Sequence, residues 1–179
     1  MMSVLGIREY PDPILRQKSR RVEKWDDDLQ RLIQDMIDTL DAVPGLGLAA
    51  VQVGAPVSLF IYDADLSSES PVKNYSVFIN PEIIYEEGEV KGEEGCLSVP
   101  DYREFVVRAE TVKVKGYDRD GKDIEITAEG LLARVFQHET DHTNGVLFID
   151  RLSSLKRGLF LRRMKKRERQ SKAEMSGRL

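Results

Sequence analysis

The chain has only two histidines, His138 and His142, and both lie in the segment QHETDH at 137–142. In an α-helix, a spacing of four positions places two side chains on the same face, about one turn apart. Glu139 directly follows the first histidine, which gives the HExxH pattern. In that pattern two imidazoles bind a metal ion and the glutamate acts as a general base on the metal's water. The alternative is two surface histidines on an amphipathic helix, but such a helix has no need for the glutamate.

A third ligand is needed, because a catalytic metal usually has three protein ligands and one open position. No further histidine exists, and Glu168 and Glu174 lie in a strongly basic segment that is unsuited to a buried ligand. The only cysteine, Cys96, is the better candidate, although a free cysteine is more often a small buried apolar residue. Glu93 and Glu94 precede it and disfavour a free thiolate, whereas a bound cation stabilises one. We therefore predict that Cys96 and the two histidines hold one metal ion.

Three helices are predicted from the spacing of apolar residues. The first spans 26–43 and begins with three aspartates that suit a helix start. The second spans 128–144 and carries both histidines, and the third spans 152–169. The residues of the second helix predicted to face the core are Leu131, Leu132, Val135 and Phe136.

Strands are predicted between the first two helices, at 57–63, 75–86, 104–118 and 124–127. The segment DRDG at 118–121 separates the last two strands and is typical of a hairpin turn. The predicted fold class is therefore α+β, with antiparallel sheets wrapped around a central helix that bears HExxH, and with one helix near each end of the chain.

Length, composition and charge limit the class of protein. The 179 residues suit one catalytic domain over 1–179, with a basic helix or tail at about 152–179. Apolar residues make up 41% and charged residues 32%, without a run long enough to span a membrane and without a secretory signal. The net charge is −4, yet 156–179 contains ten lysines and arginines against two glutamates. This basic tail favours an anionic partner such as RNA, and a solvated helix is an equally good interpretation.

Three segments resemble the signature motifs of the bacterial peptide deformylases, in the order found in that family. They are GLGLAAVQ at 45–52, EGCLS at 94–98 and QHETDH at 137–142. YPDPIL at 10–15 and GVLFIDR at 145–151 are also similar, so the likeness extends over nearly the whole chain. HExxH alone is only moderately specific, whereas three motifs in order are much more so. The chain has a basic C-terminal helix and has no long insertion between the first two motifs. In both respects it resembles the type I-like subclass, which ends in a helix.

The resemblance implies a metal-dependent hydrolase that removes the N-formyl group from formyl-methionine at the start of newly made proteins and releases formate. In such an enzyme, a hydroxide activated by the metal attacks the formyl carbon, and Glu139 transfers the proton as general base and then general acid. By the family pattern, the side-chain amide of Gln52 and the backbone N–H of Leu97 stabilise the oxyanion that develops.

The resemblance also implies where the substrate binds. Gly45 and Gly47 are expected to let the substrate backbone lie close, as an added strand beside Leu46 and near Gly95. We predict that Leu46, Leu131 and Val135 form the pocket for the methionine side chain. Plain core packing of these three residues is an equally good interpretation.

Arg108 is expected to pair with Glu94 or Asp141 and so to steady the metal ligands. The ligand set of one cysteine and two histidines suits zinc by softness and geometry. The family resemblance instead implies Fe²⁺ in the cell, with Zn²⁺ or Ni²⁺ as substitutes in a purified sample.

The implied partners are formyl-Met nascent peptides and the ribosome, which the basic C-terminal helix would contact. The protein is expected to be a cytoplasmic monomer without membrane contact. Two other function classes stay open. One is an HExxH aminopeptidase or endopeptidase that cleaves unformylated peptides. The other is an inactive ribosome- or RNA-associated protein, against which the presence of both Glu139 and Cys96 argues.

Overall fold

The computed structural model describes residues 3–66 and 73–176, with the side chains of the last helix described up to Gln170. The strands are β1 (Gly47–Ala49), β2 (Leu59–Asp63), β3 (Tyr75–Glu87), β4 (Val90–Cys96), β5 (Val99–Arg108), β6 (Thr111–Tyr117) and β7 (Asp123–Glu129). The α-helices are α1 (Asp27–Asp41), α2 (Gly130–Thr143) and α3 (Ser154–Ser176). Three short 3-10 helices are η1 (Pro13–Arg16), η2 (Ala50–Val53) and η3 (Phe148–Arg151).

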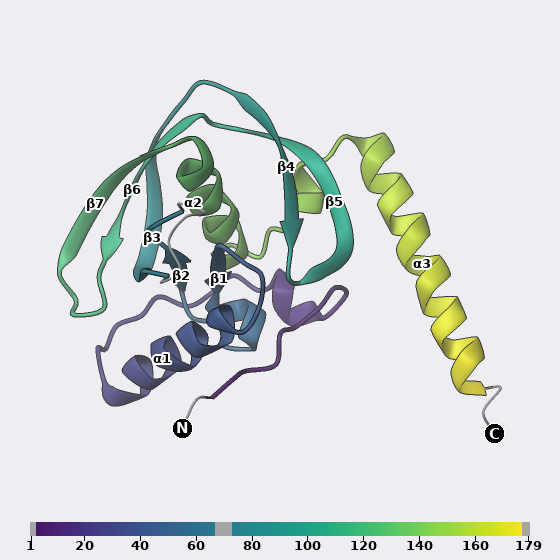
Figure 1. Ribbon diagram of the computed structural model, residues 1–179, viewed down its shortest axis with the longest axis horizontal. Coiled ribbons are helices and arrows are strands. Elements are labelled where there is room, and N and C mark those ends of the chain that lie inside the picture. The colour runs from purple at the N-terminus through teal and green to yellow at the C-terminus, as the bar shows by residue number, and fades with distance from the viewer. Residues whose placement is uncertain (1–2, 67–72, 177–179) are drawn as a thin grey trace.

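The strands form two antiparallel sheets on either side of α2. One sheet has the order β1-β2-β3-β6-β7, and the other consists of β4 and β5. Figure 1 shows α2 enclosed between the larger sheet and the β4–β5 pair, with α1 below them. This arrangement confirms the predicted α+β class with antiparallel sheets around the helix that bears HExxH.

Helix α2 is buried along most of its length because sheets lie on both sides of it. All of its residues from Ala133 to Thr143 are buried. Its apolar side packs through Phe136 against a cluster of aromatic rings from β2 and β3, namely Phe60, Tyr62 and Phe78. Its polar side is equally enclosed, so each polar group there needs a partner. Because α2 is enclosed in this way, the polar residues in its C-terminal half form a buried site.

The predicted start of α2 at 128 is wrong by two residues. Ala128 and Glu129 still belong to β7, where they pair with Val112 and Thr111 of β6. The helix begins at Gly130, whose φ of +57° lets the chain turn directly from strand to helix.

The strand predicted at 104–118 is two strands in different sheets. β5 pairs with β4, whereas β6 pairs with β3 and β7. The break falls at Ala109, whose backbone N–H and C=O both bond the side-chain amide of Gln137 on α2. Strands β1 and β4 were not predicted. β1 has three residues, and β4 reads VKGEEGC, without an alternation of apolar and polar residues.

Helix α1 agrees closely with the prediction. Asp26 is its N-cap, and the Asp26 side chain accepts a hydrogen bond from the backbone N–H of Leu29. The predicted apolar face packs into the core beneath β1 and β2, through Leu29, Ile33, Met36 and Leu40.

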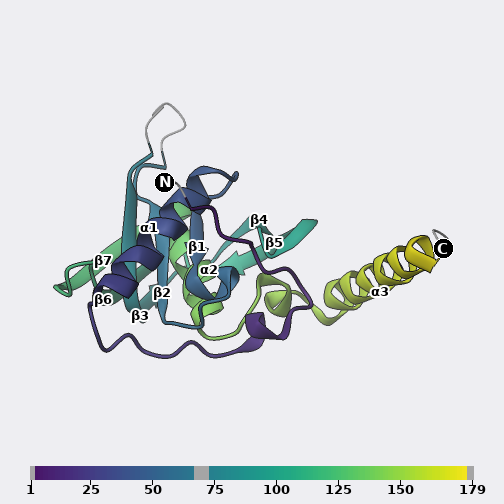
Figure 2. The same ribbon diagram turned by 90° about the horizontal axis from the view of Figure 1, so that it is seen from below.

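Helix α3 begins at Ser154 rather than 152, and Figure 2 shows it projecting away from the body of the protein. It is anchored near its start by Phe160, which is fully buried against Tyr10 and Tyr102. Of the four apolar residues whose spacing predicts this helix, Leu152 and Met164 pack against the core, whereas Leu155 and Leu159 are 68% and 52% exposed. Of the predicted tail, 177–179 lie outside the described residues. Among the described helices, none is both long enough and apolar enough to cross a membrane.

Candidate metal centre and its cleft

Cys96, His138 and His142 come together at one point, as the sequence predicts. The Sγ atom of Cys96 lies 3.3 Å from Nε2 of His142. The Nε2 atoms of the two histidines lie 3.2 Å apart, and one ligand atom from each of the three residues lies within 4.8 Å of the others. Helix α2 presents both imidazoles on one face, and Cys96 reaches them from the last position of β4.

The separations of these donor atoms fit a small divalent cation. With bonds of about 2.0–2.1 Å to nitrogen and about 2.3 Å to sulfur, a tetrahedral ion sets its ligands about 3.3 Å (N to N) and about 3.6 Å (N to S) apart. The observed 3.2 Å and 3.3 Å are within a few tenths of an ångström of those values. Cysteine and histidine are also the donors that iron, zinc and nickel accept.

The electrostatics of the centre favour one positive charge. Burial opposes a charge on His138, but its hydrogen bonds to Cys96 and Glu94 outweigh burial and hold its pKa well above the usual range. Burial and the neighbouring His138 hold the pKa of His142 well below its usual range, so that this ring is neutral and able to donate a lone pair. The surroundings that hold a proton on His138 would equally favour a cation in its place.

Glu94 orients the first histidine. Its Oε2 atom lies 3.0 Å from Nδ1 of His138, which leaves the Nε2 atom of that ring facing the centre. A carboxylate behind a ligating imidazole both orients the ring and makes it a stronger donor. Glu94 is therefore a functional residue that the sequence analysis named only as a neighbour of Cys96 and a partner of Arg108.

Behind Glu94 lies a buried network of ion pairs. Arg108 binds both oxygens of Glu94, at 2.8 Å and 2.9 Å, and also binds Asp141 at 2.5 Å. The expected pairing of Arg108 is therefore confirmed for both candidate partners. Two further arginines were not expected. Arg134 donates to Glu94 at 2.6 Å, and Arg151 donates to Asp141 at 2.5 Å and 2.6 Å. The network ties β4 and β5 to α2 and to the segment that follows it.

Glu139 lies beside the centre, in the lining of the cleft. Its side chain is buried, and its Oε2 atom has no partner among the described residues. Burial raises the pKa of Glu139 to about 7, against the lowering effect of His138. A carboxyl group with such a pKa can take up and release a proton near neutral pH.

Gly47 is required by the position of Glu139. A Cβ atom on Gly47 would lie 2.7 Å from Oε1 of Glu139, closer than unbonded heavy atoms approach. The sequence analysis assigned Gly47 to the approach of a substrate backbone. The structure adds a different reason, because β1 passes so close to α2 that only glycine leaves room for this carboxyl group.

Gln52 is held with its amide group at the centre. Its Oε1 atom accepts a hydrogen bond from the backbone N–H of Ala49 at 2.8 Å. Its Nε2 atom therefore points the other way, toward Sγ of Cys96 at 3.5 Å and Oγ of Ser98 at 3.1 Å. Leu97, the residue whose backbone N–H was expected to act with Gln52, follows Cys96 in the turn between β4 and β5. The two expected oxyanion donors thus lie on the Cys96 side of the centre.

The centre opens into a cleft of about 690 Å³. Apart from the buried His142, all residues predicted for the site line this cleft: Gly45, Leu46, Gly47, Gln52, Gly95, Cys96, Leu97, Leu131, Val135, His138 and Glu139. Leu131 is 51% exposed, so the prediction that it faces the core is wrong. The start of β5 also lines the cleft, which was not predicted, through Val99, Pro100, Asp101, Tyr102 and Arg103. No spacing signal pointed to this segment, because its role depends on the position of β5 beside the cleft.

Comparisons with known proteins agree with this geometry. The family model described as polypeptide deformylase matches residues 4–158. A peptide deformylase from Syntrophobacter fumaroxidans is 49% identical over 172 residues, which cover 96% of this chain and 100% of that protein. The crystal structure of a peptide deformylase from Legionella pneumophila has a TM-score of 0.84 at 46% identity, covering 94% of this chain and 98% of that one.

One solved relative contains a peptide. The Met-Ala-Ser-bound crystal structure of a class I type b peptide deformylase from Acinetobacter baumannii has a TM-score of 0.79 at 36% identity. The match covers 85% of this chain and 100% of that chain.

Proposed function

Because this chain belongs to the polypeptide deformylase family, and is therefore a hydrolase, we propose that it removes the N-formyl group from formyl-methionine at the start of nascent proteins and releases formate. The observation that carries the proposal is the meeting of Cys96, His138 and His142 beside the buried carboxyl group of Glu139, whose Oε2 atom has no partner among the described residues. The Met-Ala-Ser peptide in the Acinetobacter baumannii relative, which is the kind of peptide left after deformylation, supports the assignment of the cleft to the substrate. The reaction would take place in the cytoplasm, where nascent chains begin.

The chemistry divides between a metal ion and the side chains around it. Held by Cys96, His138 and His142, a divalent cation would supply Lewis-acid chemistry, which lowers the pKa of water and polarises a carbonyl group. Glu139 accepts the proton of the attacking water on its carboxyl group and then delivers that proton to the departing amine. A pKa of about 7 suits both halves of this task.

The developing negative charge on the formyl oxygen needs hydrogen-bond donors. The Nε2 group of Gln52, held in place by the bond between its Oε1 atom and Ala49, donates one hydrogen bond. The backbone N–H of Leu97 donates the second. Donors that are already oriented stabilise the transition state without first having to reorganise.

The substrate backbone would lie between two strand edges that line the cleft. β1 is the edge strand of the larger sheet, and β4 belongs to a sheet of only two strands. An extended peptide can add to such edges through backbone hydrogen bonds. Gly45 and Gly95 leave room for it, while Leu46, Leu131 and Val135 form the apolar wall for the methionine side chain.

Formate release from formyl-Met-Ala-Ser tests the function together with the metal. We expect the purified protein to release formate, a chelator to abolish this activity, and Fe²⁺ added under anaerobic conditions to restore it. Following the family resemblance, Zn²⁺ should restore less activity than Fe²⁺, and metal analysis should find about one ion per chain.

Unformylated Met-Ala-Ser is the control substrate, and the protein should leave its peptide bonds intact. Cleavage of that peptide would favour the peptidase alternative. A metal-loaded protein that acts on neither peptide would favour the inactive alternative. Full activity in the stripped protein would contradict the metal assignment.

Replacing Gly47 with alanine should lower kcat by about tenfold or more, because the new Cβ atom would push the carboxyl group of Glu139 from its place. Gly6→Ala is the matched control for stability, because Gly6 lies outside the residues that line the cleft and a Cβ atom there would meet nothing within 4 Å. Steady-state kinetics and metal analysis of both variants test the prediction. Unchanged kcat in Gly47→Ala would show that Glu139 has room to move.

The basic helix is the candidate contact for the ribosome. At 100° per residue, Arg162, Lys165 and Arg169 lie on the side of α3 that faces away from β5. A triple change of these residues to glutamine should weaken ribosome binding at least tenfold in co-sedimentation. Binding by the unaltered protein should also fall steeply between about 50 mM and 200 mM salt.

The matched control changes Lys113, Lys115 and Lys122 to glutamine, which removes the same charge from β6 and the turn after it, far from α3 in Figure 1. Binding that ignores salt, or that survives the triple change, would contradict a ribosome contact through α3.

A further inference from the structure

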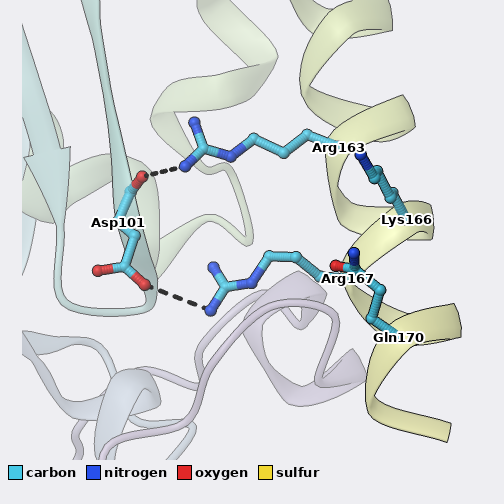
Figure 3. Close-up of a pocket in the computed structure, with 5 residues that line it drawn as sticks. All are labelled: Asp101, Arg163, Lys166, Arg167 and Gln170. Carbon is cyan, nitrogen blue, oxygen red and sulfur yellow. Dashed lines mark hydrogen bonds and ion pairs between the residues drawn. The ribbon is translucent and has the colours of Figure 1, made fainter. Parts of the chain in front are cut away.

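A second hollow, of about 540 Å³, lies between the start of β5 and α3. Figure 3 shows Asp101 on the strand side, with Arg163 and Arg167 reaching toward it from the helix. Lys166 and Gln170 of α3 complete the lining. Asp101 also lines the catalytic cleft, so the two hollows adjoin at this residue. A peptide that leaves the cleft past Asp101 would therefore enter the hollow.

Two arginines of α3 bind the start of β5 across the hollow. Arg163 donates to the backbone oxygen of Asp101 at 3.1 Å, and its guanidinium lies 6.0 Å from the ring of Tyr102. Arg167 donates to the carboxylate of Asp101 at 3.3 Å and to the backbone oxygen of Pro100 at 3.5 Å. Asp101 has a φ of +61°, a conformation that aspartate tolerates better than most residues. Met164 still packs against the core cluster that Tyr102 joins, and beyond it the long side chains of Arg163 and Arg167 connect α3 to β5.

The hollow carries an excess of positive charge. Three of its five lining residues are cations, and Asp101 is the single anion. Within the described part of the chain, Arg167 is the only one of these cations that pairs with a carboxylate. Arg163 bonds a backbone oxygen and a ring instead, and Lys166 has no ion pair with a described residue. Two positive charges therefore face the hollow without compensation.

We propose that this hollow binds an acidic side chain of the substrate, several residues after the formyl-methionine, and so makes the enzyme favour acidic over basic nascent chains at that position. The inference deepens the proposed deformylase function and rests on it. An arginine fork suits a carboxylate, which it can bind through two parallel hydrogen bonds. The carboxylate of Asp101 already pairs with Arg167, so the substrate carboxylate is expected at Arg163 and Lys166, the two cations of the lining without a described anionic partner.

The length of chain needed follows from the strand register. Cys96 pairs with Val99 across the turn, and Asp101 lies two residues further along β5, about 7 Å at about 3.3 Å per residue. A hollow of about 540 Å³ is about 8 Å across, so an extended peptide with its formyl group at the centre covers about 15 Å and reaches the arginines after about four to six residues. The expected acidic preference is therefore confined to the fourth to sixth positions of the substrate.

A walking series of peptides tests the inference. Formyl-Met-Ala-Ser is extended with alanines to eight residues, and a single glutamate or lysine is placed at each position from the fourth to the eighth. At low ionic strength we expect kcat/KM for formate release to be about three- to tenfold higher with glutamate than with lysine at the fourth to sixth positions. The difference should lie in KM, because the contact is far from the reacting bond, and should vanish near 0.5 M salt.

Two double variants of the full-length protein locate the effect. In Arg163→Gln with Arg167→Gln, the glutamate-to-lysine ratio should fall to about one. In Lys165→Gln with Arg169→Gln, which removes the same charge at the same spacing from the other side of α3, the ratio should persist. Dividing each rate by the same variant's rate on formyl-Met-Ala-Ser removes any effect on the cleft as a whole. If the first variant loosens α3, the single change Lys166→Gln should still lower the ratio about twofold.

The outcomes are separable from those of the proposed function. Equal rates for glutamate and lysine peptides at every position, with formate still released from formyl-Met-Ala-Ser, would overturn the inference and leave the deformylase function intact. A preference that survives the Arg163 and Arg167 changes, or that both double variants lose equally, would also overturn it. A ratio near one in the unaltered protein, together with weaker ribosome binding by the Arg163 and Arg167 double variant, would assign the hollow to a phosphate group and overturn the inference. No formate from any peptide would instead reject the proposed function.

Discussion

Replacing Glu139 with glutamine is expected to lower kcat for formate release by about 10²- to 10⁴-fold, while the protein keeps its metal. Glutamine has nearly the shape of glutamate, so the close fit between this side chain and Gly47 is preserved. Glutamine cannot accept the proton of the attacking water, and the departing amine would leave without a proton donor. The loss should therefore appear in kcat, with little change in the binding of the peptide.

Metal analysis and binding of unformylated Met-Ala-Ser complete this experiment. The matched control is Glu129→Gln, the same change at an exposed position beside the start of α2. Turnover of Glu139→Gln at the rate of the unaltered protein would reject the proton-transfer role. Loss of the metal along with the activity would assign Glu139 to holding the site together instead. Glu139→Ala should lose at least as much activity, because it removes the carboxyl group and also opens the space beside Gly47 to water.

Replacing Glu94 with glutamine is expected to destabilise the protein by about 3–5 kcal/mol, the usual result of removing one partner from a buried ion pair. Glu94 is buried and accepts hydrogen bonds from Arg108 and Arg134. Glutamine keeps the shape but leaves the buried guanidinium group of Arg134 without a carboxylate partner and that of Arg108 with Asp141 alone. It also offers His138 a weaker partner, so metal affinity should fall by about 10- to 100-fold.

Urea unfolding of the metal-free protein gives the free energy of unfolding, and metal titration gives the affinity. The adjacent Glu93→Gln is the matched control. Glu93 is about half exposed and pairs with Arg103 at 3.5 Å on the surface, so its loss should change stability by no more than about 1 kcal/mol. If Glu94→Gln is as stable as Glu93→Gln and binds metal equally well, the network is not what holds β4 and β5 against α2.

The same network predicts a dependence on pH. Burial alone would raise the pKa of Glu94, but the hydrogen bonds from Arg108 and His138 outweigh it and hold the pKa well below the usual range. Because the folded value is below the unfolded one, this stabilisation is complete at neutral pH and is lost as pH falls below about 4. Glu94→Gln should therefore show a smaller loss of stability between neutral and acid pH than the unaltered protein.

Local pattern was sufficient where an element is long and one of its faces is buried. Helix α1 was predicted because its apolar residues repeat at helical spacing and Asp26 caps its start. For α2, the helix itself was predicted but its first residue was not, because Ala128 and Glu129 are held in β7 by pairing with β6. That pairing depends on a neighbouring strand, and the residues themselves carry no sign of it.

The sheets were less predictable, because strand identity depends on partners. The segment from 104 to 118 is nearly continuous in strand-forming residues, and the side chain of Gln137 on α2 interrupts it at Ala109. β4 contains two glycines and three charged residues, which argue against a strand by themselves. It is a strand because β5 pairs with it and because Glu94 is satisfied by arginines from β5 and α2.

By itself, the sequence determined which atoms could bind a metal and part of their geometry. Two histidines four positions apart on a helix share a face whatever surrounds them, because helical geometry is local. The tertiary structure alone decided that Cys96, more than forty positions earlier, ends 3.3 Å from His142. It also decided that Gly47 makes room for Glu139, and that the start of β5 joins the cleft to the basic face of α3. These contacts join residues far apart in the chain. They result from strand pairing and from the packing of α2 between two sheets, and local residue spacing encodes neither of these.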